Sequence, residues 1–273
     1  MRTLRRLPLT VITFALVLVI FVVPFYFIVL QAVKTPSEAS ELSMAWPTVT
    51  QALSNFQTVI AARDYDLIVA FINSSVLTVV SVTFMVLFAS MTAYIWQRRR
   101  GWIGLAIQFM VLAGLVIPPA VVPTVWVLQL LDMFKTMHGL MLIEITFHTS
   151  FCVLIFRGFI ASIPREIDEA AIVDGAGALK LFYTIIFPLL KPVIVTVIVV
   201  QSVAVFNDFT NPLYFLPGYP TVQYTLYTYI SDTLSTYNLL FMNVLLITIP
   251  PLIMFIIFNR QMVAGMTSGA VKG

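Results

Sequence analysis

The chain has 273 residues, of which 60% are hydrophobic and 10% are charged. Soluble domains carry roughly a quarter charged residues, so this composition excludes an ordinary soluble enzyme or binding module and indicates an integral membrane protein. The formal net charge is +3, but the basic residues lie beside apolar segments rather than in one patch, which argues against nucleic-acid binding. The single cysteine, Cys152, lies in an apolar segment, so the sequence offers no disulfide framework and no thiolate metal site.

Six apolar windows are long enough to cross the hydrocarbon core of a bilayer, which takes about 20 residues. In chain order the predicted spans are Leu9–Val33, Leu67–Gln97, Trp102–Leu131, Gly139–Ile160, Pro192–Leu213 and Asn238–Asn259. We therefore predict an all-α fold, a polytopic membrane protein with six transmembrane helices. The start of the chain is basic like that of a signal peptide, but its apolar run of about 24 residues is too long for one, so we expect an uncleaved first span.

Basic residues give the predicted orientation. Six spans place both termini on one side, and if that side is the cytosol, only Lys34, Arg63 and Lys135 of the 15 Lys and Arg residues lie outside. The other twelve, including the run Arg98-Arg99-Arg100, lie in inner segments. The positive-inside rule then predicts cytosolic N- and C-termini.

The outer segment Lys34–Asp66 separates the first two predicted spans. It fits a turn followed by a short amphipathic helix at the membrane interface, and it equally fits a plain connector. We divide the chain here into an N-terminal part, residues 1–66, with the first span and this segment, and a core of five spans, residues 67–273.

The inner segment 161–191 is too polar to span lipid but is rich in helix signals. Pro164 suits a first helical turn, and the acidic residues that follow suit the positive end of the helix dipole. These are Glu166, Asp168 and Glu169. Gly175 and Gly177 fit the end of this helix, and Pro188 stops the short helical stretch that comes next.

Small and apolar side chains recur along this helix at spacings of three and four residues. The apolar ones are Ile163, Ile167, Ala170 and Ala171, and Asp174 continues the same spacing. A helix of about two turns is marginal on its own in water, so we expect it to be stabilised by docking. The residues alone leave two surfaces open for that docking, a partner protein and the chain's own helical bundle.

The same segment resembles the EAA loop of importer-type ATP-binding-cassette (ABC) permeases. The matching positions are Glu169-Ala170-Ala171, Asp174-Gly175-Ala176, Phe182, Ile185 and Pro188-Leu189, in a loop that precedes the penultimate span. The resemblance implies the type I importer permease (MetI-like) architecture. It also implies that the loop forms a coupling helix in a groove of the ATPase subunit, and it assigns Glu169, Ala170, Ala171, Asp174, Gly175 and Ala176 to that docking.

The resemblance extends over nearly the whole chain to carbohydrate-uptake permeases of the maltose-transporter class. It is carried by Asn73-Ser74-Ser75, by residues 155–159 with 162–164, by Phe206-Asn207-Asp208-Phe209 with Pro212-Leu213, and by the tail 263–273. The tail is similar to that of the second maltose permease, which implies that Thr267, Ser268 and Gly269, in the cytosolic segment 260–273, contact the ATPase interface. Phe206 departs from the family pattern, which often has Trp there.

No ATP site is expected in this chain. A P-loop needs Gly-Lys-Ser/Thr after a glycine-rich turn, and none of the five lysines follows a glycine. We therefore do not expect an enzyme, and we place ATP and Mg on partner ATPase subunits. We predict no catalytic residue, no bound cofactor and no metal ligand, and we interpret His138 and His148 as structural or interfacial.

Polar residues inside a span are costly and suggest function. Asn207, Asp208 and Asn211 near the outer end of the fifth predicted span are therefore candidates for the translocation pathway. Capping of a helix end and contact with an external binding protein are alternatives for Asp208.

The resemblance implies a permease subunit of a sugar or oligosaccharide importer in the bacterial cell membrane. Its implied partners are a second permease subunit, two ABC ATPase subunits, an extracytoplasmic solute-binding protein, the sugar and the lipid bilayer. The alternatives are an ABC permease for a non-sugar solute and a secondary transporter driven by an ion gradient, which would require inverted repeats and carboxylates at mid-membrane.

Overall fold

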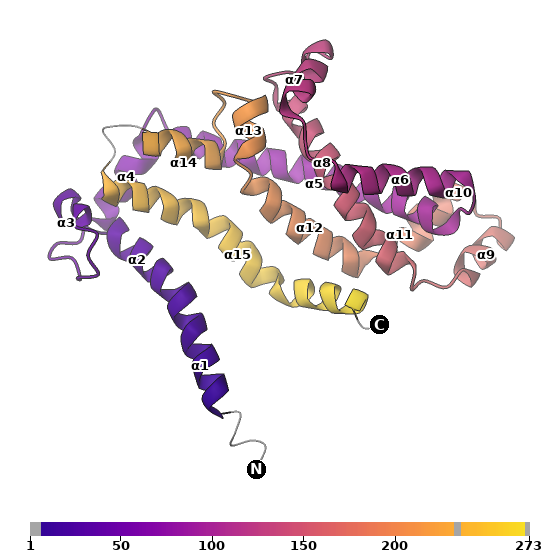
Figure 1. The fold of residues 1–273 in the computed structure, drawn as a ribbon, viewed down its shortest axis with the longest axis horizontal. Helices are drawn as coiled ribbons and strands as arrows, with labels where there is room; N and C mark the ends of the chain where they lie inside the picture. Colours follow the sequence, from indigo (N-terminus) through magenta and orange to yellow (C-terminus); the bar gives the residue numbers. More distant parts are fainter. Residues whose placement is uncertain (1–6, 232–235, 271–273) are drawn as a thin grey trace. The chain divides into compact units, whose positions relative to one another are not determined.

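The computed structural model of the protein describes residues 7–231 and 236–270 (Figure 1). The regular structure of this part of the chain is entirely helical, which confirms the predicted all-α class. The chain divides into two compact units, residues 1–71 with 222–250 and residues 72–221 with 251–273.

The first unit contains the first predicted span. Three helical segments follow one another without a break, α1 Leu7–Val17, the π-helical η1 Leu18–Val22 and α2 Val23–Ala32. Within them, Thr13–Ala32 is long and apolar enough to cross a membrane. The same unit holds α3 Pro36–Ser40, α4 Ala52–Ala61, α14 Val222–Ser231 and the first part of α15 Tyr237–Ala270.

The segment between the first two spans is more than a plain connector. In α4, Asn55 and Val59 lie one helical turn apart and are buried, while most other side chains of the helix are exposed. This pattern confirms the predicted short amphipathic helix. Its position at a membrane interface stays a prediction.

Asn55 fastens α4 to two other segments of the first unit. Its Nδ2 donates to the backbone oxygens of Ala32 (2.8 Å) and Lys34 (2.9 Å), at the end of α2. Its Oδ1 accepts from Nδ2 of Asn238 (2.9 Å) at the start of α15. One buried amide therefore satisfies three partners from two segments that lie far apart in the sequence.

The second unit contains the remaining helices. These are nearly all of α5 Asp66–Arg98, then α6 Trp102–Val116, α7 Val121–Leu130, α8 Met137–Ile160, α9 Glu166–Val173, α10 Ala178–Lys180, η2 Leu181–Ile186, α11 Phe187–Leu189, α12 Lys191–Phe206, α13 Thr210–Phe215 and the rest of α15. Within this unit α8 packs against α6, α12 and α13, and its buried apolar side chains, among them Phe156 and Ile160, belong to the apolar core.

Two predicted spans are not straight helices. The third, Trp102–Leu131, bends by 119° between α6 and α7, where Pro118 and Pro119 interrupt the helix. The fifth, Pro192–Leu213, is not one helix either, because α12 ends at Phe206 and α13 begins at Thr210. The chain also bends by 76° between α11 and α12, at Leu190, just before this predicted span. Among the described residues, four helices are long and apolar enough to cross a membrane, or six segments if each bent pair is one span.

Candidate functional site

The loop at residues 161–191 forms the predicted helix, α9 Glu166–Val173, with its three acidic residues in the first turn. Pro164 lies just before the N-cap, Arg165, and not within the first turn as expected. Beyond α9 the chain continues through α10 and η2 to α11, and the bend at Leu190 comes two residues after Pro188. The predicted helix is confirmed, displaced by about one residue at its start.

The end of α9 is a Schellman turn. Gly175 has a positive φ of 77°, which only glycine adopts at little cost. The N–H of Ala176 donates to the oxygen of Ala171 (2.9 Å), and the N–H of Gly175 donates to the oxygen of Ile172 (3.0 Å). These two hydrogen bonds satisfy carbonyls that the helix end would otherwise leave free.

The face of α9 that packs on the protein is centred on Asp168 and Ala171, which are 8% and 5% exposed. The Tyr94 hydroxyl donates to Asp168 Oδ1 (2.5 Å), and an Arg98 nitrogen lies 2.8 Å from Asp168 Oδ2. The same Arg98 nitrogen donates to the backbone oxygen of Ile163 (3.1 Å). A buried, charged contact therefore joins α9 to the end of α5.

Two more arginines add to this junction. Arg165 donates to the backbone oxygen of Gln97 (3.2 Å), and Arg157, in the last turn of α8, donates to Gln97 Oε1 (3.2 Å). The Arg157 guanidinium also lies 3.6 Å from the centroid of the Trp96 ring, a cation–π contact. The last turn of α5 is thus tied both to α8 and to the start of α9.

The opposite face of α9 is open. Of the residues that the sequence assigned to docking, four are exposed. They are Glu169, Ala170, Asp174 and Gly175. Ala176 is half-buried, and Ala171 is covered by the chain itself. The small-residue face that the spacing predicted is therefore divided, because Ile163 and Ala171 pack inward while Ala170 and Asp174 do not.

Three large apolar side chains that sequence reasoning missed lie on this loop. Ile172, Val173 and Leu179 are 60%, 86% and 67% exposed. The sequence shows them as aliphatic residues in an otherwise polar loop, and this feature could have indicated an exposed apolar surface. Beside them a cavity of about 520 Å³ is lined by charged and apolar side chains, including Arg99, Glu169 and Ile172. The loop therefore presents a surface that combines a cavity, exposed apolar side chains and charged side chains.

A polar cluster lies where α13 meets α8. Glu144 of α8 is fully buried, and its Oε1 accepts from Asn211 Nδ2 (3.1 Å), while His148 Nε2 lies 3.4 Å from its Oε2. Asp208 accepts from the backbone N–H groups of Thr210 (2.9 Å) and Asn211 (3.2 Å). Asp208 precedes the N-cap, Phe209, and its carboxylate satisfies two N–H groups at the start of α13, which fits the capping of a helix end that was one alternative for this residue.

The three candidates for the translocation pathway do not form one group. Asn211 joins Glu144 inside the protein, and Asp208 caps a helix beside it. Asn207 is exposed, and its side-chain amide donates back to the oxygen of Val203 (2.9 Å). Sequence reasoning overlooked Glu144, although a carboxylate inside an apolar span and four residues before His148 was a usable signal.

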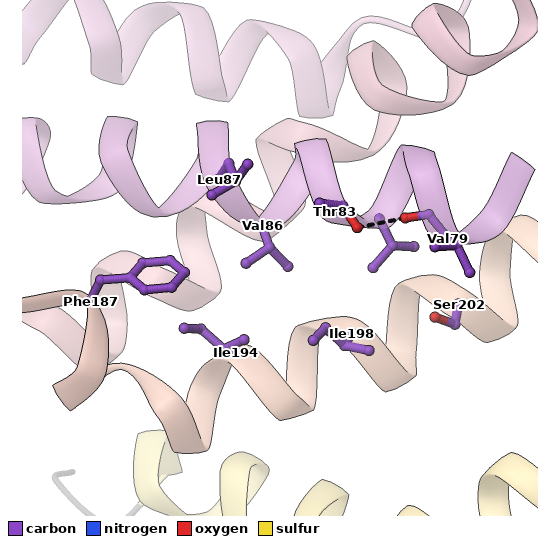
Figure 2. Close-up of a pocket in the computed structure, with 9 residues that line it drawn as sticks. Val79, Thr83, Val86, Leu87, Phe187, Ile194, Ile198 and Ser202 are labelled. Atoms are coloured by element: carbon purple, nitrogen blue, oxygen red, sulfur yellow. Dashed lines mark hydrogen bonds between the residues drawn. The ribbon is translucent and has the colours of Figure 1, made fainter. Parts of the chain in front are cut away.

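A cavity of about 320 Å³ lies between α5 and α12. Figure 2 shows the side chains that line it. Of its nine lining residues, Thr83 and Ser202 carry hydroxyls, and Thr83 donates its own to the Val79 oxygen (2.7 Å). The others are Val79, Val82, Val86, Leu87, Phe187, Ile194 and Ile198. The lining therefore offers two hydroxyls in a surface that is otherwise apolar.

The predicted interface residues of the tail, Thr267, Ser268 and Gly269, lie in the last turns of α15, whose backbone is described. Their side chains lie outside the described residues. Their contact with an ATPase stays a prediction.

Comparison with known proteins gives relatives along the whole chain. It is 29% identical to the melibiose/raffinose/stachyose import permease protein MelC of Bacillus subtilis (strain 168), covering 100% of both chains. It is 29% identical to the probable starch degradation products transport system permease protein AmyC of Thermoanaerobacterium thermosulfurigenes, covering 93% of this chain and 92% of that one. It is 32% identical to the multiple sugar-binding transport system permease protein MsmG of Streptococcus mutans, covering 74% and 76%.

The fold also matches a solved structure, that of a bacterial ABC transporter involved in the import of the acidic polysaccharide alginate. The TM-score is 0.74 at 16% identity, over 93% of this chain and 96% of that chain. The family model of the binding-protein-dependent transport system inner membrane component matches residues 85–267, which include α9 and its contacts. This protein therefore belongs to the family of inner membrane components of binding-protein-dependent transport systems.

Proposed function

We propose that this chain is a transmembrane permease subunit of an ABC importer for a sugar or oligosaccharide. The family supports the permease role, and the names of three relatives concern saccharides or starch products. The chain would form half of the translocation pathway with a second permease subunit. An extracytoplasmic solute-binding protein would deliver the sugar to this pair.

The observation that carries the proposal is the two-sided arrangement of α9, which we call the coupling helix. Its inner face is fixed by the Asp168 contacts, and its outer face leaves Glu169, Ile172 and Val173 open. An apolar surface of this kind on a polar loop is typical of a protein contact. The ATPase subunit is the proposed partner, with the exposed residues Ala170, Asp174 and Gly175 at the edge of the contact.

The proposed mechanism is alternating access. Two ATPase subunits hold ATP and Mg, and their closure moves the coupling helices, while docking of the binding protein acts on the opposite side of the membrane. Together these events shift the permease pair between inward-facing and outward-facing states. The loop 161–191 and both termini face the cytosol in this proposal, as the distribution of basic residues favours. The tail with Thr267, Ser268 and Gly269 would then also reach the ATPase.

The test uses the complete complex purified from membranes. We expect Glu169→Arg to reduce the ATPase subunits that co-purify with this chain by at least about tenfold, since a reversed charge at the centre of a contact is costly. The control is Glu166→Arg, which makes the same change at an exposed position in the first turn of the same helix. Unchanged assembly and transport with Glu169→Arg would contradict the assignment.

Two further measurements test which solute is transported and which energy source drives its transport. We expect saccharides, presented with the binding protein, to raise the ATPase rate of the reconstituted complex. Stimulation by a non-sugar solute alone would favour the other class of ABC permease. Uptake by this chain without ATPase subunits, driven by an ion gradient, would favour a secondary transporter.

A further inference from the structure

Two adjacent carboxylates of the coupling helix lie in opposite environments. Asp168 is 8% exposed and is bound by Tyr94 and Arg98, whereas Glu169 is exposed. Docking to a partner can involve only the exposed one. Asp168 therefore has a different role from that of the docking residues.

The partners of Asp168 come from one face of one helix. Tyr94 and Arg98 lie one turn apart near the end of α5, so both side chains reach the same carboxylate, one to each oxygen. A nearly buried carboxylate is stable only when it is paired and hydrogen-bonded. Rotating α9 by one residue would move Asp168 away by about 100° and leave Arg98 without it. The contact thus fixes the rotation of α9 about its own axis.

Helix α5 links the contact at Asp168 to a second contact near its own N-terminal end. α5 continues from Arg98 back to Asn73 as unbroken helix, 25 residues earlier or about 38 Å along the axis. There Nδ2 of Asn73 donates to the backbone oxygen of Pro220 (2.8 Å), in the segment after α13. Between these two points α5 forms one wall of the apolar cavity, opposite α12 (Figure 2). A displacement applied at Asp168 has no hinge in α5 to absorb it.

We propose that Asp168, held by Tyr94 and Arg98, is a positioning residue that transmits the displacement of the coupling helix to α5. This inference rests on the proposed function, because the displacement comes from the ATPase subunits. It separates two roles within one short helix. Glu169 and its exposed neighbours bind the ATPase, and Asp168 passes the motion on to the membrane-spanning part.

The test measures assembly and coupling separately in the reconstituted complex. The variants are Asp168→Asn, Tyr94→Phe and the charge exchange Arg98→Asp with Asp168→Arg. The matched control is Glu166→Gln, an exposed acidic position in the same helix turn. For each variant we would measure the ATPase subunits retained and the sugar transported per ATP hydrolysed.

We expect Asp168→Asn to retain the ATPase subunits and to lower the sugar transported per ATP by at least about tenfold, because Arg98 is left without its counter-charge. Tyr94→Phe removes one hydrogen bond and should lower the ratio by roughly twofold to fivefold. Each single charge reversal should lower it further, and the exchange should recover part of the loss. A merely structural role would change yield or stability without changing this ratio.

Two results would overturn the inference. One is an unchanged transport-to-ATP ratio in both Asp168→Asn and Tyr94→Phe, and Tyr94→Phe alone decides the matter if Asp168→Asn does not fold. The other is loss of the ATPase subunits in Asp168→Asn, which would make Asp168 a docking residue. Failure of the unaltered chain to retain any ATPase subunit is a different outcome, because it overturns the proposed function itself.

Discussion

The turn that ends the coupling helix offers a perturbation whose cost can be worked from the backbone. Gly175 has φ +77°, and a Cβ added there would meet no atom within 4 Å. Gly175→Ala therefore introduces no clash, and its cost is that of holding an L-residue in the left-handed region, about 1–2 kcal/mol. That energy equals roughly a fivefold to thirtyfold change in the equilibrium between the closed and open forms of the turn.

Gly177 provides the matched control. A Cβ there would also meet no atom within 4 Å, but the backbone has φ −68° and ψ 161°, which any residue adopts. We expect Gly177→Ala to be neutral, or more stable by about 0.4–1 kcal/mol through the unfolded chain. Gly175→Asn should lie between the two alanine variants, because asparagine tolerates positive φ better than alanine does.

Hydrogen exchange on the complete complex is the assay. The N–H groups of Gly175 and Ala176, which close the turn onto α9, should exchange roughly fivefold to thirtyfold faster in Gly175→Ala and at the unaltered rate in Gly177→Ala. Coupling of ATP hydrolysis to transport should weaken in parallel. Equal exchange rates in the two alanine variants would refute the reasoning, because neither added Cβ meets an atom and only position 175 has a positive φ.

Three further changes test packing and buried polar contacts by thermal unfolding of the detergent-solubilised protein. Asn55→Ala loses three buried hydrogen bonds and should destabilise by roughly 2–3 kcal/mol. Gly139→Ala drives a Cβ into a backbone oxygen and should cost about 1–3 kcal/mol, whereas Gly158→Ala meets no atom within 4 Å and should be tolerated. Glu144→Gln keeps an acceptor for Asn211 and should be mild, while Glu144→Leu leaves that amide unpaired and should cost about 1–3 kcal/mol more.

The fold was predictable wherever apolar length alone decides it. Hydropathy located the spans, but the mean hydropathy of a window carries no information about the direction of the helix axis. It therefore could not show the 119° bend within the third predicted span or the 76° bend just before the fifth. Pro118 and Pro119 signalled the first bend and could have been read from the sequence. The second bend, at Leu190, comes two residues after Pro188, which marked the end of a helical stretch in the sequence, so its place was predictable although its angle was not.

The candidate site was also predictable only in part. The start and end of α9 are set by local chemistry, the acidic first turn and Gly175, and these features were predictable. Which face of α9 turns inward depends on Tyr94 and Arg98, which lie 74 and 70 residues before Asp168. Spacing alone therefore placed Ala170 and Ala171 on one face. Glu144 was missed because its partner Asn211 is distant in the sequence, although its charge within a span was visible.

In the proposed function, one face of the short coupling helix packs on its own chain and the other face binds the ATPase. Eight residues make about two turns, which is too few for a stable helix in water, so tertiary contacts must hold it. If the ATPase supplied all of these contacts, the helix would unfold whenever the partner moved away. It could then not transmit a displacement of the ATPase to the rest of the chain. Asp168 removes this difficulty, because its contacts to α5 lie within the chain and persist without the ATPase. Asp168 and Glu169 are adjacent in the sequence and lie about 100° apart around the helix axis. Asp168 therefore stabilises the helix, while Glu169 stays available to bind the partner.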